Sequence, residues 1–494
     1  MLRPVFTQPP TCHSLTSHAA PLEVHQRVYG SDPHSFLYES LESAGGRGRY
    51  SFLGGRPRLV FRTKGDVIEL ATSGCVRRVT GDPLEALGKL MGPSRGTSQR
   101  VPFPGGAVGY LGYDMVRFCE RLPDTKADDL NHPDSALIFP DEVIAFDHQT
   151  GEIHLFVFEH RRAGARLREL ADLISSCPSH GLPRHRADSG GSERGAAACS
   201  GSSCEPLEPM RSNTTKDEFK AAVERAREYI RAGDIFQVVL SQRFDFALRQ
   251  SPLDVYTALR QSNPSPYMYF LHLDGLNVLG SSPEILVKVE DGVVSTRPLA
   301  GTRPRGKDRA TDRALAAELL ADEKERAEHA MLVDLARNDI GRVCDLGTVA
   351  PTELYNIERY AHVMHLVSHV QGRLAPGRDA VDVIRATFPA GTVSGAPKVR
   401  AMEIIEELEP VKRGIYGGAI GYLSLSGEMD LCIAIRTIVL DGSRGYIQVG
   451  AGVVADSVPE REYSETLHKA AGMMRAVGAH SDFSQRSAST LFAS

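Results

Sequence analysis

Four glutamates in the C-terminal half of the chain have the residue type and spacing to bind a hard metal ion. Glu325 and Glu328 form one pair, and Glu462 and Glu465 form the other. Each pair has i, i+3 spacing in a stretch with a helical pattern, so its two carboxylates project from one face of a helix. Carboxylate oxygens suit Mg²⁺, which proteins hold with few carboxylates plus waters and substrate oxygens. We expect the two pairs to face each other across a cation, although either pair alone would be an ordinary solvated helix face.

Two glycine-containing segments could approach an anionic ligand closely. Residues 391–398 (GTVSGAPK) form a glycine-rich turn that leads into a helix, where free N–H groups and the helix dipole attract anions. A plain strand-to-helix connection explains this turn almost as well, and the segment does not match a P-loop. Gly450, Ala451 and Gly452 follow a strand-like run. Glycines there would allow close approach of a ligand to the backbone, but a bulge or tight turn is the simpler interpretation.

Two further polar residues lie in strand-like apolar runs. Arg436 follows Ile435 in such a run, and its guanidinium needs either a substrate carboxylate or an internal ion pair. His365 alternates with Val363 and Val367 and so shares their face of a strand. A histidine there is most often a core residue, but it is also the side chain best suited to carry protons near neutral pH.

The elements that must position these residues predict an α+β fold. A capping box at 215–218 starts a helix that Gly233 ends, and a helical pattern at about 312–341 carries the first glutamate pair. Hairpins are predicted across the Gly65-Asp66, Asp274-Gly275 and Asp291-Gly292 turns. A strand at 362–370, a helix at 397–408 and a last helix from Pro459 follow. Hairpins interspersed with helices favour α+β over a parallel doubly wound sheet.

Composition excludes several classes of function. The 494 residues are 41% hydrophobic with a net charge of −5, so no basic field suggests nucleic acid, and no apolar run is long enough to span a membrane. The eight scattered cysteines form no metal spacing, which favours reduced thiols in the cytoplasm. Residues 177–210 hold hardly any large apolar side chain and predict a flexible insertion between an N-terminal region, 1–176, and a second region, 211–480. Residues 481–494 are predicted to be a disordered tail.

Four motifs in order resemble one known family. They are DLARND at 334–339, MHLVS at 364–368, GTVSGAPK at 391–398 and GAGVVADS at 450–457. The chain resembles the chorismate-utilising enzymes, and within them the large subunits (component I) of anthranilate synthases. The resemblance is strong over 211–478 and weaker in the N-terminal third. It implies the fold of that family, in which antiparallel sheets pack as a sandwich with helices outside.

The resemblance also implies a set of site residues. Glu328 and Glu465 match the family's Mg²⁺ ligands, and Glu325 and Glu462 match a second layer that acts through water. Residues matching the substrate-binding positions are Tyr416, Arg436, Gly450, Ala451, Gly452 and Lys469. Glu284 matches the general acid, which needs a raised pKa to act. Thr392 matches a residue that lines the ring, and His365 matches a histidine tied to the elimination step.

The implied reaction is the first step of tryptophan biosynthesis. Ammonia adds at ring C2 of chorismate with loss of the C4 hydroxyl, and pyruvate is then eliminated to give anthranilate. Relatives that use water carry a lysine where this chain has Gln237, which cannot take a proton. The 4-amino-4-deoxychorismate synthases carry a lysine nucleophile where this chain has Ala300. Component I of such a synthase is the alternative function, and a non-catalytic relative that senses tryptophan is another.

Feedback inhibition by tryptophan is a further implication. Residues 37–40 (LYES) and 263–268 (NPSPYM) resemble the two walls of the inhibitor site. The predicted tryptophan-binding residues are Ser40, Asn263, Pro264, Tyr267 and Met268; the alternative is that they are core hairpin residues. Tyr38 replaces a usual leucine there, and His468 replaces a usual asparagine near the metal pair. Feedback by tryptophan would also suit a chain with no tryptophan of its own.

The ammonia source is expected to be a separate protein. No Gly-x-Cys-x-Gly elbow occurs in the sequence, so the chain contains no recognisable amidotransferase nucleophile. By analogy with the family, a glutamine amidotransferase subunit would supply ammonia within a hetero-oligomer.

Overall fold

The computed structural model describes residues 2–41, 48–94, 101–159, 161–177, 210–360 and 363–478. Nearly all of the predicted 177–210 insertion and the whole predicted tail at 481–494 lie outside these residues. The helices are α1 (Pro21–Tyr29), α2 (Pro83–Met91), α3 (Ala163–Ser175), α4 (Lys216–Ala232), α5 (Pro252–Ser262), α6 (Arg309–Ala321), α7 (Glu323–Gly341), α8 (Ala380–Thr387), α9 (Lys398–Leu408) and α10 (Pro459–Ala476), with 3₁₀ turns η1 (Tyr113–Phe118) and η2 (Gly391–Val393). None of the described helices is both long and apolar enough to cross a membrane.

The strands pair with one another in antiparallel fashion. Those of the N-terminal part are β1 (Thr11–Thr16), β2 (His34–Glu39), β3 (Tyr50–Lys64), β4 (Val67–Thr72), β5 (Cys75–Thr80), β6 (Gly106–Leu111), β7 (Ser135–Asp147) and β8 (Glu152–Val157). Those that follow are β9 (Arg211–Ser212), β10 (Gln237–Ala247), β11 (Tyr267–Leu273), β12 (Leu276–Ser282), β13 (Ile285–Glu290), β14 (Val293–Thr296), β15 (Leu299–Pro304), β16 (Ala350–Arg359), β17 (Val363–Arg373), β18 (Gly395–Ala396), β19 (Ala419–Ser424), β20 (Met429–Ile433), β21 (Thr437–Asp441) and β22 (Arg444–Val453).

The hydrophobic cores show a sandwich covered by helices. One core is built from strand and loop residues alone, including Phe36, Ile138 and Val278, so it lies between facing parts of the 22-stranded sheet that the described residues form. The other two large cores combine the opposite faces of the same strands with helices: α2, α7 and α8 in one, and α1, α3, α5 and α10 in the other. Along β7, Ile138 faces the inner core and Leu137 an outer one, as the two-residue period of a strand requires. The predicted α+β sandwich is confirmed.

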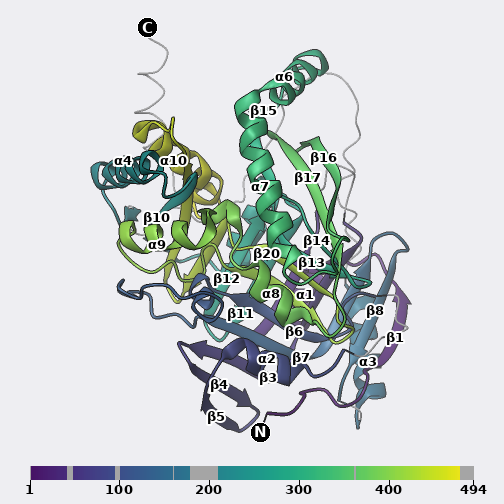
Figure 1. Ribbon diagram of the computed structural model, residues 1–494. Coiled ribbons are helices and arrows are strands. Elements are labelled where there is room, and N and C mark those ends of the chain that lie inside the picture. Colours follow the sequence, from purple (N-terminus) through teal and green to yellow (C-terminus); the bar gives the residue numbers. More distant parts are fainter. Residues whose placement is uncertain are drawn as a thin grey trace.

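The N-terminal and C-terminal parts of the chain share sheets. β2 pairs with β11, with Glu39 opposite Met268. β6 pairs with β19, with Gly109 opposite Gly421. Figure 1 shows the N-terminal strands at one end of the molecule, with α7 and α10 rising at the other end. The boundary predicted near 177–210 therefore separates two stretches of sequence whose strands build common sheets.

Local sequence signals locate most elements correctly. Thr215 and Glu218 form the predicted capping box at the start of α4, and Gly233 ends that helix in the left-handed conformation. The β11–β12 and β13–β14 hairpins form across their Asp-Gly turns, where Asp274 and Asp291 both have positive φ. Such turns match the twist of the two strands they join.

Three local predictions were wrong. The helical pattern at 312–341 is two helices, because the Asp322 side chain accepts hydrogen bonds from the N–H groups of Lys324 and Glu325 and starts α7 anew. Arg436 does not lie in a strand; it separates β20 from β21 with a positive φ of 49°. The stretch 450–452 does not follow a strand but lies inside β22, paired with β10.

A buried ion pair joins the elements beneath the glycine-rich turn. Arg413 is 2% exposed, and its guanidinium donates to the Glu409 carboxylate and to the carbonyls of Val393 and Val239. Glu409 in turn accepts from the Ser241 N–H at 2.8 Å. Because every one of these contacts is buried, removal of one partner would leave the charge of the other buried and unpaired. The pair thereby holds η2 against β10 and the end of α9.

Candidate functional site

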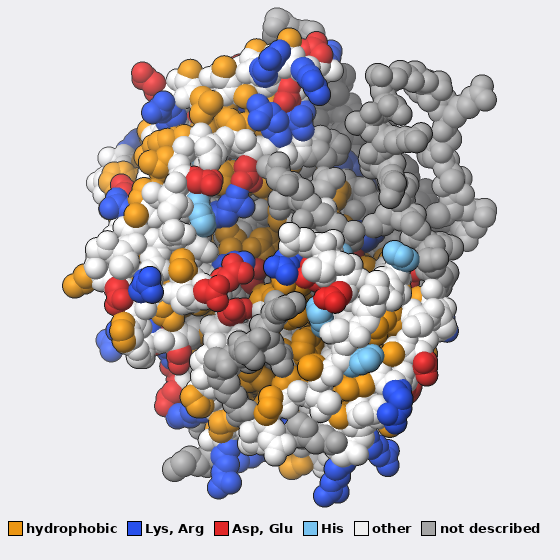
Figure 2. Space-filling view, turned by 90° about the vertical axis from the view of Figure 1, so that its right-hand side faces the viewer, with side chains coloured by type: hydrophobic (Ala, Val, Ile, Leu, Met, Phe, Trp, Pro, Cys, Tyr) orange, Lys and Arg blue, Asp and Glu red, His pale blue; other side chains and the backbone are white. Residues whose placement is uncertain are grey.

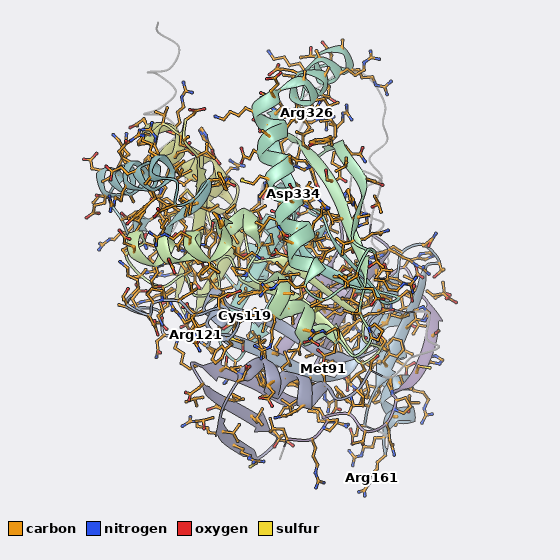
Figure 3. The ribbon with its side chains drawn as sticks, viewed as in Figure 1. Met91, Cys119, Arg121, Arg161, Arg326 and Asp334 are labelled. Atoms are coloured by element: carbon orange, nitrogen blue, oxygen red, sulfur yellow. The ribbon has the colours of Figure 1, made fainter. Side chains whose placement is uncertain are left out.

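The four glutamates come from α7 and α10 and lie within electrostatic range of one another. Burial raises the pKa of Glu328 most, and the nearby carboxylates of Glu325 and Glu465 raise it further. Burial also raises the pKa of Glu462, with Glu465 adding to the effect. Glu328 lies on α7 between Arg326 and Asp334, which Figure 3 labels. The structure thus places Glu328 of α7 within electrostatic range of Glu465 of α10, although the two helices are far apart in the sequence.

Two cationic or amide side chains limit the repulsion between these carboxylates. Lys469 Nζ lies 2.7 Å from Glu465 Oε1 and also donates to the Gly450 carbonyl at 2.9 Å. Gln237 Nε2 donates to Glu328 Oε1 at 3.1 Å. His468 is exposed on α10. A cation bound between these carboxylates would reduce the repulsion that helps to raise the pKa of Glu328.

The carboxylates of Glu328 and Glu465 have the chemistry of a magnesium site with few protein ligands. Within the described residues, no three His, Cys, Asp or Glu side chains gather closely enough to hold an ion alone. Glu328 and Glu465 offer carboxylate oxygens, and Mg²⁺ usually keeps several water or substrate oxygens as well. Two protein ligands are therefore enough for such an ion.

Glu284 is the buried carboxyl group of the site. It lies between β12 and β13 and is 7% exposed. Burial raises its pKa to about 8, against the opposing effects of Thr392, Arg436 and Lys469. At neutral pH the carboxyl therefore keeps its proton, which is the state that a general acid requires. A third strand, β20, holds its backbone, since Ile433 N–H donates to the Glu284 carbonyl at 3.0 Å.

Thr392 lies beside this carboxyl in the η2 turn. Its hydroxyl oxygen is buried and makes no hydrogen bond of standard length within the described part of the chain. It is nevertheless close enough to Glu284 to lower the pKa of that carboxyl. The hydroxyl and the carboxyl also line one small cavity together with Gly391 and Leu335.

Arg436 supplies an unpaired positive charge. Among the described residues, no carboxylate lies within ion-pair distance of its guanidinium. Burial lowers its pKa, opposed by Tyr360 and Glu284. Its left-handed backbone costs energy in a residue with a side chain, and such strain is typical of functional positions. Of the two predicted roles, an internal ion pair is not found among the described residues, and an anionic ligand is favoured.

His365 is neutral and oriented by the backbone. It is 5% exposed on β17, and its Nδ1 lies 3.0 Å from the Gly301 carbonyl and 3.1 Å from Thr302 Oγ1. Burial lowers its pKa to about 4. A carbonyl can only accept, so Nδ1 carries the hydrogen and Nε2 is left as an acceptor. The ring of Tyr360, a residue that sequence reasoning missed, lies edge-on to it with centroids 5.6 Å apart.

The glycines of β22 leave room for neighbouring polar groups. A Cβ at Gly450 would lie 2.5 Å from the Tyr416 hydroxyl, and a Cβ at Gly452 would lie 3.0 Å from Gln237 Nε2. Ala451 points to the other side and is fully buried. Gly450, Gly452 and Tyr416 are therefore brought together with Gln237, while the Ala451 side chain is part of the protein interior.

The predicted tryptophan residues gather where β2 ends and β11 begins. Leu41 N–H donates to the Ser265 carbonyl, which places Ser40 beside the 263–266 turn. The Tyr267 hydroxyl donates to Asp430 at 3.0 Å, a half-buried carboxyl that the sequence had not indicated. Met268 packs in the outer core, on the opposite face from Tyr267, so only its backbone can face the same ligand.

The substituted Tyr38 belongs to the same region. Its hydroxyl donates to the Gly421 carbonyl at 3.0 Å and to the Gly109 carbonyl at 3.4 Å. The tyrosine thereby ties β2 to the β6–β19 pair behind the predicted inhibitor site. A leucine in its place could make neither hydrogen bond.

Comparisons with known proteins agree with this architecture. A family profile described as chorismate binding enzyme matches residues 48–475. The chain belongs to this family. It is 47% identical over 445 residues to anthranilate synthase component 1 of Acetivibrio thermocellus, covering 90% of each chain. The crystal structure of anthranilate synthase component I from Streptococcus pneumoniae superposes with a TM-score of 0.74 at 40% identity, covering 87% of this chain and 92% of that one.

A more distant solved structure shares the fold of these chorismate binding enzymes. The menaquinone-specific isochorismate synthase of Escherichia coli superposes with a TM-score of 0.66 at 20% identity, covering 96% of each chain. At this identity the likeness shows the fold alone. Differences in chemistry must therefore come from side chains on a common scaffold.

The buried Glu284 carboxyl generates a prediction about stability. Its pKa is about 8 in the folded protein against an ordinary value of 4.5, so the folded state binds more protons between these pH values. The free energy of unfolding then falls as pH rises through that window, and the effect is absent below it. We expect Glu284→Gln to be more stable than the wild type by roughly 3–5 kcal/mol above pH 8. Chemical denaturation at several pH values measures the difference.

Glu460→Gln is the matched control for this prediction. Glu460 lies on the surface in ion pairs with Lys216 and Lys220. Its replacement should not stabilise the protein at alkaline pH. An equal gain for Glu284→Gln at acidic and alkaline pH would show that the carboxyl does not titrate as described.

Proposed function

We propose that this chain converts chorismate and ammonia into anthranilate and pyruvate, as component I of an anthranilate synthase. The observation that carries the proposal is the unpaired guanidinium of Arg436 beside the protonated carboxyl of Glu284. Chorismate has two carboxylates and a hydroxyl leaving group. A site with a free cation and a neutral acid matches both features. The names of the relatives with 44–47% identity support the same assignment.

Different residues of the chain would bind the two carboxylates of chorismate and the magnesium ion. Arg436, the Tyr416 hydroxyl and the backbone at Gly452 would hold the enolpyruvyl carboxylate. Lys469 would lie near the ring carboxylate, next to Glu465. Glu328 and Glu465 would hold Mg²⁺, with Glu325 and Glu462 acting through water. When bound, the ion supplies positive charge that offsets repulsion between the acidic site and an acidic substrate.

The chemical step needs proton transfers at defined atoms. As ammonia forms its bond to ring C2, the C4–O bond breaks, and Glu284 donates its proton so that water leaves. Thr392 would stabilise the Glu284 carboxylate that results. Loss of the C2 proton and cleavage of the C3–O bond then release the enolpyruvyl group and make the ring aromatic. The released enolate takes up one proton at its methylene carbon to become pyruvate, so the proton lost from C2 is balanced. The neutral His365 presents Nε2 as a hydrogen-bond acceptor, but its lowered pKa makes it a weak general base. It is therefore better suited to positioning the substrate than to removing its proton.

Two positions support amination over related chemistries. Gln237 donates to Glu328, and its amide has no proton-accepting group that could activate water. Ala300 lies in β15 opposite Leu366, the neighbour of His365, and has no nucleophilic atom. A 4-amino-4-deoxychorismate synthase component and a non-catalytic relative that senses tryptophan are the alternatives.

Ammonia would come from a separate glutamine amidotransferase subunit in a hetero-oligomer. The relatives are named component 1, which implies a second component in those proteins. We also expect the complex to lie in the cytoplasm, since the six described cysteines are all free thiols.

Product analysis tests this function directly. We expect the purified chain, given chorismate, Mg²⁺ and ammonium salts, to form 2-aminobenzoate and pyruvate, identified by fluorescence and mass. Glu284→Gln should lower the rate by about 10²–10⁴-fold, because a general acid is lost. A 4-amino product would indicate the alternative synthase. No turnover by a folded protein would indicate the non-catalytic relative.

Metal dependence is a separate prediction. Chelation should abolish turnover, and Glu328→Gln or Glu465→Gln should raise the Mg²⁺ concentration for half-maximal rate by about tenfold or more, since one charged ligand is lost. Glu460→Gln, on the same helix as Glu465, is the control and should leave that concentration unchanged. Full activity in the chelated protein would contradict the assignment.

Tryptophan should inhibit the reaction. We expect Asn263→Ala to raise the tryptophan concentration for half-inhibition by about tenfold, because the amide that lies between the 263–266 turn and Gly472 of α10 is removed. Asn277→Ala, at the far end of the β11–β12 hairpin, is the matched control. Each variant is compared by its ratio of rates with and without tryptophan. An inhibition curve that is flat at saturating tryptophan would refute the regulatory site.

A further inference from the structure

Lys398 makes a buried contact that joins three helices beside the glycine-rich turn. It is the first residue of α9, and its Nζ lies 2.7 Å from Asp339 Oδ2 on α7. The same ammonium donates to the carbonyl of Thr387, the last residue of α8, at 3.2 Å. The Lys398 and Asp339 side chains are only 10% and 15% exposed. One cation thus fixes α7, α8 and α9 relative to one another.

The ion pair borders the cavity that also reaches the catalytic acid. Asp339 and Thr387 line this cavity, and so do Thr392 and Glu284. The small cavity therefore has the ion pair as one wall and the proposed acid with its hydroxyl neighbour as another. Loss of the ion pair can therefore shift the position of Thr392 without moving the substrate-binding residues.

A second contact seats the turn against α7. Leu335 lies so close to Gly391 that a Cβ on the glycine would be 2.1 Å from Leu335 Cδ2. Leu335 and Asp339 have i, i+4 spacing, so they lie on one face of α7. The apolar contact restrains the start of the turn, and the ion pair restrains its end. Thr392 lies between them, next to Gly391.

The ion pair is poorly explained by stability alone. Burial raises the pKa of Asp339, and Lys398 only offsets that effect. Removing two charges from water costs about as much as their attraction returns, so a buried pair is weak evidence for stability. Its directional contacts to two helices are better suited to fixing a position.

We propose that the Asp339–Lys398 ion pair is a positioning contact that holds Thr392 against the Glu284 carboxyl. This inference rests on the proposed function of Glu284 as the acid. Without the pair, the 391–398 turn would keep its apolar contact at Leu335 but lose its restraint at the start of α9. Thr392 would then move away from the carboxyl, and Glu284 would lose the neighbour that favours its ionised form.

The test compares Lys398→Met with Arg400→Met on the same helix. Arg400 forms surface ion pairs with Asp234 and Glu403, so its loss removes a comparable charge on the side away from the cavity. We expect Lys398→Met to lower kcat about tenfold or more with little change in KM. The alkaline limb of the pH–rate profile should move to higher pH, because the pKa of Glu284 rises when Thr392 moves away. Arg400→Met should change neither.

The other groups facing Glu284 must be accounted for in the pH profile. They are Arg436, Lys469 and Tyr360. Thr392→Val should move the alkaline limb in the same direction as Lys398→Met, and the double variant should move it no further than Thr392→Val alone. Additive shifts would mean that Lys398 acts through one of those other groups and would overturn the proposal. Lys398→Arg should restore part of the lost rate, since it keeps the charge.

A readout without substrate separates this inference from the proposed function. The titration of Glu284 can be followed by carbon NMR of labelled carboxyl groups, with Glu284→Gln assigning the signal. An upward pKa shift in Lys398→Met supports the proposal even if chorismate is not turned over. An unchanged titration in a folded variant overturns it even if chorismate is turned over. Should Lys398→Met fail to fold, Asp339→Asn keeps the side-chain shape and is judged by the same shift.

Discussion

The structure depends on holding ionisable groups away from water without complete internal compensation of their charges. Glu284 is held away from water, and Arg436 has no carboxylate partner in the part of the chain that is described. The carboxylates on α7 and α10 repel one another. A protein tolerates such an arrangement only if the surrounding scaffold supplies the free energy, because each buried charge opposes folding. These groups are left ready for an anionic ligand and a cation.

The scaffold is built from contacts between distant parts of the chain. β2 pairs with β11, β6 with β19, and β10 with β22, so the residues of the site lie on elements fixed by long-range strand pairing. The inner core is made of strands and loops, and helices cover the outer faces. Glu284 lies between β12 and β13, and Arg436 lies between β20 and β21, so strand pairing fixes the backbone on both sides of each residue. The outer surface differs from this enclosed site. Figure 2 shows one face of the molecule, on which acidic and basic side chains are mixed and exposed to solvent.

Several small polar contacts set the protonation states on which the proposed chemistry relies. The Gly301 carbonyl selects the tautomer of His365, and Thr392 moderates the pKa of Glu284. Arg413 and Lys398 each anchor the region of the 391–398 turn from a different side. The anchoring charges lie near the site without facing the substrate groups. This arrangement separates the groups that bind from the groups that position.

The sequence by itself determined the local elements and the family. The capping box at Thr215, the Asp-Gly turns and the two glutamate pairs each depend on neighbours within a few residues, so their patterns can be interpreted without coordinates. Four ordered motifs were enough to indicate a chorismate-utilising enzyme, and the family match agrees. The break at Asp322 was missed because a helical pattern continues on both sides of the cap.

Only the tertiary structure decided which of these residues act together. Three findings depend on strand register and packing between distant segments. Glu465 of α10 raises the pKa of Glu328 on α7, Arg436 has no ion pair with any described residue, and Met268 turns away from Tyr267. The sequence did not indicate Tyr360 or Asp430, because the residues next to them form no motif of a functional site. Burial, which sets the pKa of Glu284, is a property of the whole fold. The types of residue were present in the chain, but their environment exists only once it is folded.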